Sequence, residues 1–166
     1  MTFVFDSSAL ITAHRTELPF TRFQPFWDWM SEQAERGEIT FPSVVLEECS
    51  GTDKLACWLE EHAKPYKISD NQAFPYLQKV LLAYGANIEA KDLGKIENDA
   101  IVIAHAMAIK EADKRVGVVT CERRNNATRP GNMSMPNVCE ILEIPWFSLP
   151  AFLWTHLHSA FNGNGG

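Results

Sequence analysis

Short apolar runs alternate along this chain with longer segments in which apolar residues recur at helical spacing. Segments with that spacing predict helices, and compact runs of apolar residues predict buried strands. A further helix is expected after Ser7 and Ser8, because polar residues before an apolar run mark a helix start. The expected strands are residues 2–6, 38–41, 116–120 and 144–147, and the other expected helices are residues 23–36, 43–49, 52–63, 72–84, 99–109 and 150–160.

Glycine, proline and serine mark several boundaries of these elements. Gly37 is expected to end the helix over residues 23–36. Ser43 is expected to cap the next helix, with Pro42 just before it. Pro145 places the last strand at a sheet edge, because proline cannot donate to a strand ladder. Residues 66–69 are expected to form a short connector or strand.

Strands separated by helical segments predict an α/β domain of three layers, α/β/α, with a central, mainly parallel sheet. Ligands of such sheets bind at the carboxyl ends of the strands. Asp6 and Glu122 both come just after a predicted strand. This edge of the sheet is therefore the first place to look for a functional site.

Length and composition are those of an ordinary globular protein. The 166 residues suit one domain, expected over residues 1–160, and the tail 161–166 is expected to be disordered. No apolar run reaches the roughly 18 residues of a membrane span, and no basic segment precedes the first apolar run, so a cytoplasmic location is expected. The four cysteines form no C-x-x-C pair and are expected to be reduced thiols.

The net charge of −6 argues against a general nucleic-acid coat protein, which would normally be basic. It is compatible with a nuclease that uses acidic side chains to hold a metal ion. Such a nuclease would still need a local basic patch for the phosphate backbone.

Four carboxylates stand at expected strand or helix ends, namely Asp6, Glu48, Asp99 and Glu122. Carboxylate oxygens suit Mg²⁺ or Mn²⁺, which can activate water for attack on a phosphate without a side-chain nucleophile. Each acid also has a purely structural interpretation. Asp6 and Asp99 could cap helices, Glu48 and its neighbour Glu47 could be solvated, and Glu122 could be a loop residue.

At these residues the chain resembles the PIN-domain family. The resemblance rests on four motifs: residues 4–11 around Asp6, residues 42–49 around Glu48, the helix opened by Asp99, and Val118-Val119-Thr120-Cys121-Glu122. The closing stretch, from Met135 to Leu153, is similar to an uncharacterised bacterial branch of that family, so the resemblance spans residues 3–153.

The resemblance implies a PIN-like fold and a Mg²⁺- or Mn²⁺-dependent ribonuclease, often the toxin of a toxin–antitoxin pair. By position, Asp6, Glu48, Asp99 and Glu122 would be the catalytic metal ligands. Ser8 and Thr120 would support them by hydrogen bonding. The chain departs from the family in having Glu122 where Asp is usual, and Glu47 competes with Glu48 for the second position.

Partners can be anticipated from basic and aromatic residues. The candidates for RNA contact are Arg15, Arg22, Arg123, Arg124 and Arg129, and the loop that follows Glu122 is expected to be flexible and exposed. His105, within an apolar helix, is expected to be a packed core histidine. Aromatic residues around the helix over 23–36 are expected to pack in the core, with a homodimer or antitoxin interface as the alternative.

Three rival interpretations stay open beside the ribonuclease. The same acids could serve a phosphatase or a DNA nuclease. The domain could be a non-catalytic PIN-like interaction module, although all four acids are present. A flavodoxin-like or receiver-type domain would require an acidic pair directly after the first strand, and this chain lacks one.

Overall fold

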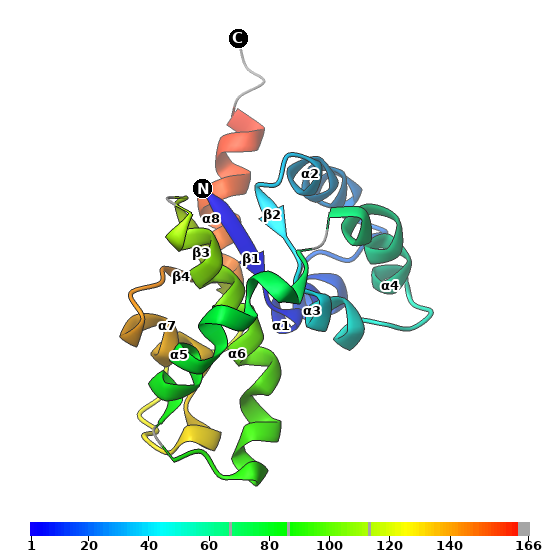
Figure 1. Ribbon diagram of the computed structural model, residues 1–166. Helices are drawn as coiled ribbons and strands as arrows, with labels where there is room; N and C mark the ends of the chain where they lie inside the picture. The colour runs from blue at the N-terminus through cyan, green and yellow to red at the C-terminus, as the bar shows by residue number, and fades with distance from the viewer. Residues whose placement is uncertain (67, 86, 113, 163–166) are drawn as a thin grey trace.

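A parallel sheet forms the centre of the protein (Figure 1). The computed structural model describes residues 1–66, 68–85, 87–112 and 114–162. The four strands have the spatial order β2-β1-β3-β4, and each pairs in parallel with its neighbours. The strands are β1 (Thr2–Phe5), β2 (Ile39–Thr40), β3 (Val116–Thr120) and β4 (Trp146–Ser148). All four predicted strands and the parallel sheet are thereby confirmed.

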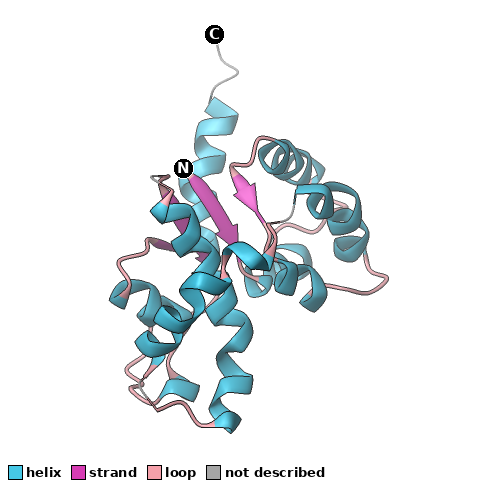
Figure 2. Ribbon diagram, viewed as in Figure 1, coloured by secondary structure: helices cyan, strands magenta, loops and turns pink. Residues whose placement is uncertain are grey.

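Helical segments surround the sheet on both sides (Figure 2). The α-helices are α1 (Ser7–Thr12), α2 (Gln24–Glu35), α3 (Ser43–Glu48), α4 (Lys54–Trp58), α5 (Phe74–Tyr84), α6 (Ala90–Glu111), α7 (Met135–Ile141) and α8 (Leu149–Asn162). Short π- or 3₁₀-helical segments are η1 (Ala13–Glu17), η2 (Leu59–Ala63), η3 (Lys64–Tyr66), η4 (Asp70–Gln72) and η5 (Pro130–Asn132).

The alternation of side chains along β1 explains the three layers. Phe3 and Phe5 project to the same face, because side chains two residues apart share a face of a sheet. Both rings pack edge-on against Phe152 of α8, each with ring centroids 5.0 Å apart. Helix α6 packs against β1 and β3, and Figure 1 shows α6 and α8 on opposite sides of the strands. The three-layer α/β/α arrangement is thus confirmed.

Helix α6 begins earlier than the sequence indicated. The helix starts at Ala90, so Asp99 lies inside it. The prediction that Asp99 opens this helix is therefore wrong. Asp92, Ile96 and Ala100 form the buried stripe of its first turns. The stripe was missed because one of its members is a buried aspartate, which a hydrophobicity pattern assigns to the surface.

Of the two predicted helix boundaries at Gly37 and Ser43, one is confirmed and one is wrong. Gly37 follows α2 with a φ of +68°, the left-handed conformation expected of a glycine that ends a helix. Ser43 is the first residue of α3 and makes no capping bond, so the predicted cap is wrong; the N-cap position belongs to Pro42, whose carbonyl accepts from Val45 N–H at 3.0 Å.

The last strand and the chain end can also be compared with expectation. β4 lies at the sheet edge as Pro145 indicated. Ile68 forms an isolated parallel bridge with Pro42, whereas position 67 lies outside the described residues. Helix α8 extends to Asn162, so the expected tail begins too early. Positions 163–166 of that tail lie outside the described residues.

The aromatic residues around α2 mostly pack in the core, as expected. Phe26 and Trp27 are buried, and Phe20 stacks on Trp27 with ring centroids 4.0 Å apart. Phe23 is exposed. His105 is fully buried, as predicted, and its Nε2 lies 2.9 Å from Asp70 Oδ1. Across the ranges described, no helix has both the length and the apolar character needed to cross a membrane.

Candidate acidic site at the carboxyl edge of the sheet

Asp6 anchors the site where β1 ends. Its carboxylate is 5% exposed and occupies the N-cap position of α1 without forming a capping bond, which excludes the purely structural interpretation as a cap. Instead its Oδ2 accepts hydrogen bonds from the Ser8 hydroxyl and from Thr120 Oγ1, the latter at 3.0 Å. Ser8 and Thr120 therefore fix the orientation of Asp6 by hydrogen bonding.

Glu122 joins the site from the neighbouring strand. β1 and β3 run side by side in parallel, so Asp6 and Glu122 emerge at the same edge of the sheet. Thr120 Oγ1 accepts from the backbone N–H of Glu122 at 3.1 Å, while it donates to Asp6. Glu122 Oε2 accepts from the N–H of Met135, at the start of α7, at 2.8 Å. Glu122 is thus half-buried and held, and is no free loop residue.

Glu48 approaches from α3 and meets α6. Its Oε1 accepts a hydrogen bond from Asn98 Nδ2 at 2.6 Å. Its neighbour Glu47 lines a cavity formed by α3, α4 and η2. The two glutamates therefore have different surroundings, and Glu48 is the one that contacts α6.

Asp99 comes from α6, directly after Asn98, and lies half-buried among the other acids. Burial first, and then the negative charges of Glu122, Asp6 and Glu48, raise the pKa of Asp99 to about 8. An aspartate at the start of a helix would be stabilised as an anion. Asp99 experiences the opposite, because it lies within the helix and faces like charges.

The other acids experience the same crowding. Burial raises the pKa of Asp6, and Glu48 adds to the rise, while the hydrogen bonds from Ser8 and Thr120 oppose it. Burial also raises the pKa of Glu122, with Asp6 adding to the rise and the Met135 N–H opposing it. Four acids that the sequence places up to 116 residues apart thus share one electrostatic environment.

The four carboxylates do not converge on one point in this structure. Among the described residues, no three His, Cys, Asp or Glu side chains are arranged closely enough to hold a metal ion. Three of the acids are directed to other partners: Asp6 to Ser8 and Thr120, Glu48 to Asn98, and Glu122 to Met135.

Two side chains of the site were not anticipated. Asn98, which binds Glu48, could have been suspected from its position beside Asp99. Tyr84, at the end of α5, is fully buried, and its hydroxyl has no hydrogen-bond partner within the described part of the chain. Burial, followed by the charges of Asp99 and Glu122, raises the pKa of Tyr84. No sequence signal indicates Tyr84, because its position depends on how α5 packs against α6.

The arginines proposed for RNA contact are spread over several elements. Arg15, Arg22 and Arg123 are exposed. Arg124 forms an ion pair with Glu140 at 2.9 Å, and Arg129 lies 3.4 Å from Asp92. Only Arg123 and Arg124 follow an acid of the site directly in sequence.

The loop after Glu122 is exposed, as expected, but its first part is tied to α7. Asn125 N–H donates to Asn137 Oδ1 at 3.0 Å, and Asn137 Nδ2 donates to the Asn125 carbonyl at 2.7 Å. Asn125 Nδ2 also donates to the carbonyl of Asn132 at 2.8 Å. The expected flexible loop therefore has a defined set of hydrogen bonds near the site.

Comparison with known proteins assigns a family but no activity. Residues 3–158 match the family model described as Domain of unknown function (DUF4411), and the chain belongs to that family. No curated protein sequence shows significant similarity to the chain. No solved structure does so either.

Proposed function

We propose that this member of the DUF4411 family is a PIN-like, metal-dependent endoribonuclease whose active centre is the acidic site. The observation that carries the proposal is the gathering of four carboxylates from β1, α3, α6 and the end of β3 at one edge of the sheet. Their proximity, together with burial, raises the pKa of Asp99 to about 8. Crowded carboxylates destabilise a fold unless a cation or a proton offsets their charge. Their hard oxygen atoms suit Mg²⁺ or Mn²⁺.

The ligand set would comprise Asp6, Glu48, Asp99 and Glu122. Glu48 would have to release Asn98, and Glu122 would have to release the Met135 N–H, before both could turn toward a common ion. When bound, Mg²⁺ or Mn²⁺ supplies a water of lowered pKa and neutralises charge on the phosphate. The donor chemistry, four carboxylates, fits such an ion.

The protein's own groups supply orientation. Ser8 and Thr120 hold Asp6 through its Oδ2, and Thr120 also holds the backbone at Glu122. In the reaction, a water molecule gives up a proton as its oxygen bonds to phosphorus, the bond from phosphorus to the leaving sugar oxygen breaks, and that oxygen takes up a proton, so that one water is consumed. This chemistry needs no nucleophilic side chain.

The further expectations rest on the resemblance and on general chemistry, and they stay predictions. They are an RNA substrate contacted by Arg15, Arg22, Arg123 and Arg124, an antitoxin protein partner, a homodimer, and a cytoplasmic location. The rival functions are a nuclease or phosphatase for another phosphate ester, and a non-catalytic interaction module. Cleavage assays and Mn²⁺ calorimetry separate both rivals from the ribonuclease.

The first measurement is cleavage of a mixed panel of structured and single-stranded RNAs, a DNA and a phosphate monoester, with Mn²⁺, with Mg²⁺ and with chelator. Asp6→Asn and Asp99→Asn should each lower metal-dependent cleavage by about 100-fold or more, because each removes a charged ligand. Asp28→Asn is the matched control, since Asp28 is exposed on α2 and accepts a hydrogen bond from Gln24 of its own helix.

The outcomes separate the rivals. Cleavage of DNA or of a phosphate monoester in place of RNA would move the activity to another substrate while leaving the site intact. If no substrate is cut and calorimetry detects no Mn²⁺ binding, the catalytic proposal fails and the interaction module is favoured.

A further inference from the structure

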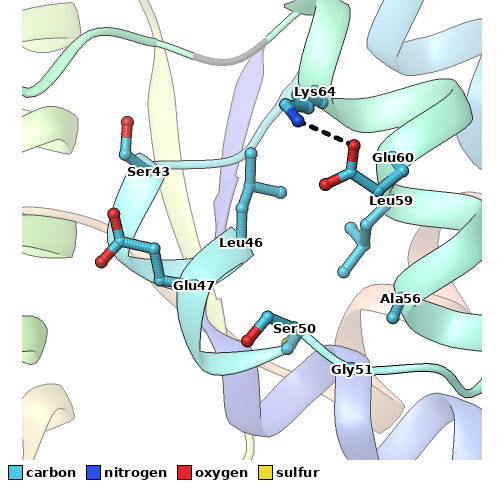
Figure 3. A pocket seen from close by; sticks show the side chains of 10 residues that line it. Ser43, Leu46, Glu47, Ser50, Gly51, Ala56, Leu59, Glu60 and Lys64 are labelled. Carbon is cyan, nitrogen blue, oxygen red and sulfur yellow. Dashed lines mark hydrogen bonds and ion pairs between the residues drawn. The ribbon is translucent and has the colours of Figure 1, made fainter.

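A cavity of about 390 Å³ opens beside the acidic site, on the other side of α3. Figure 1 shows α3 between α6 and α4, and the cavity is lined by residues of α3, α4 and the segment after α4. Figure 3 shows Leu46 of α3 and Leu59 of η2 within the cavity, with the Glu60–Lys64 pair at one end and Ser50 at the other. Its volume lies in the range that small ligands occupy.

Cys49 joins the cavity to the acidic site. It lines the cavity and is 6% exposed. Burial first, and then the charges of Glu48 and Asp6, raise the pKa of the Cys49 thiol to about 12, while the exposed Arg15 acts in the opposite direction. Cys49 directly follows Glu48 of the acidic site in the sequence, so the cavity and the site share the end of α3.

The walls and the rim differ in character. Leu59 and Ala56 are buried and present apolar surface, as the flat faces of a nucleobase require. At the rim, Lys64 Nζ lies 2.8 Å from Glu60 Oε2, and both side chains are exposed. This pair places an anionic acceptor directly beside a cationic donor.

The charge of the lining excludes a phosphate as occupant. Glu47 and Glu60 contribute two negative charges against the single positive charge of Lys64, which Glu60 already engages. A phosphate would be repelled here, whereas an uncharged base would not. The phosphate of the same nucleotide would lie outside the cavity.

We infer that this cavity binds a guanine base of the RNA strand, next to the nucleotide whose phosphodiester is cut at the acidic site. Guanine alone offers two adjacent N–H donors beside a carbonyl acceptor on one edge, which match Glu60 and Lys64. Bases of single-stranded RNA are recognised through this edge while their faces rest on side chains. The inference rests on the proposed function, because it names a specificity site for the same substrate.

Binding can be tested without metal and without cleavage. We would titrate the metal-free protein with guanosine, adenosine, cytidine and uridine, and follow the methyl resonances of Leu46 and Leu59 by NMR. Guanosine should shift the methyl resonances of both leucines. It should also bind at least about 10-fold more tightly than the other nucleosides. Glu60→Gln should weaken guanosine binding by a similar factor.

Glu32→Gln is the matched control for Glu60→Gln. Glu32 forms the same kind of exposed pair, four residues from Arg36, but on α2. Glu32→Gln should leave guanosine binding unchanged. Equal binding of adenosine and guanosine, or guanosine binding that does not shift Leu46 and Leu59, would overturn the assignment.

A second arm examines the strand. Random-sequence RNA is cut by the wild type and by Glu60→Gln, and the fragment ends are sequenced. A guanine enriched at one fixed distance from the cut, and lost in the variant, supports the inference. Tighter binding of free GMP than of a guanine-containing oligonucleotide would overturn the RNA strand as the source of the base.

The two arms separate this inference from the proposed function. If guanosine shifts Leu46 and Leu59 but no RNA is cut, the ribonuclease fails and the guanine-binding cavity stands without its RNA context. If RNA is cut with no base preference and guanosine does not bind, the cavity assignment fails and the ribonuclease stands.

Discussion

Asp99 lies half-buried beside three other carboxylates, and this placement changes when it releases its proton. In the unfolded chain, Asp99 should titrate at about pH 4, whereas in the folded protein its pKa is raised to about 8. Between these values the folded state binds more protons than the unfolded state. The free energy of unfolding should therefore fall as the pH rises from about 4 to about 8.

Asp99→Asn should remove part of this dependence. In metal-free thermal denaturation, the wild type should lose more stability between pH 5 and pH 8 than Asp99→Asn, and the variant should be the more stable of the two at pH 8. Mn²⁺ should stabilise the wild type mainly at pH 8, because the deprotonated carboxylates are its ligands. Parallel pH profiles of the two proteins would show that Asp99 does not titrate as described.

Tyr84 is a second residue whose surroundings lead to a testable expectation. Its buried hydroxyl has no partner within the described residues, and such a group costs stability. Tyr84→Phe should therefore raise the free energy of unfolding by about 1 kcal/mol in urea denaturation. It should also lower RNA cleavage by about 10-fold or more, because a donor close to the acids is lost.

Tyr76→Phe provides the comparison, since Tyr76 lies on the same helix and is partly exposed. It should change neither stability nor cleavage appreciably. If Tyr84→Phe instead destabilises the protein and leaves cleavage intact, its hydroxyl serves the fold and has no part in the site.

At the level of elements, the contact between α6 and η5 holds the loop that follows Glu122. Gly131 packs directly on Asp92 of α6, and Asp92 is also approached by Lys95 and Arg129, each at 3.4 Å. A Cβ at Gly131 would lie 2.3 Å from Asp92 Oδ1 and 2.8 Å from its Cγ. Because Asp92 is buried and engaged on two sides, it has little room to move away.

Gly131→Ala should therefore destabilise the protein by roughly 1–3 kcal/mol in urea denaturation, as overpacking does. Gly94→Ala is the matched control, because Gly94 lies in α6 and a Cβ there meets nothing within 4 Å. Alanine at position 94 should stabilise the helix by about 0.5–1 kcal/mol. Equal effects of the two substitutions would contradict the close contact of η5 with α6.

The elements also indicate how far the sequence could predict the structure. Strands such as Val116–Thr120 were predictable, because compact runs of buried apolar residues have few other structural solutions. The start of α6 was not, because its buried stripe includes the charged Asp92. An aspartate becomes buried through partners from distant segments, here Arg129, and those partners are not visible along the chain.

At the level of the whole molecule, the candidate site was predictable only in part. Asp6 and Glu122 could be paired from sequence, because parallel strands present their carboxyl ends at one edge. Asp99 was found for the wrong local reason, since it lies within α6. Tyr84 and the cavity beside Cys49 depend on how helices pack against one another, and no local pattern specifies that packing.

Strand β3 lies between β1 and β4 although it is synthesised long after β1. Synthesis proceeds at about 5–20 residues per second, so Asp6 leaves the ribosome well before its neighbour strand exists. The four acids cannot meet until the chain has passed Glu122, and Glu122 is held in place only after Met135 has followed. A growing chain of this protein is therefore unable to assemble its acidic site until the segment up to Met135 has been made, so a cell that makes it encounters no active fragment shorter than that.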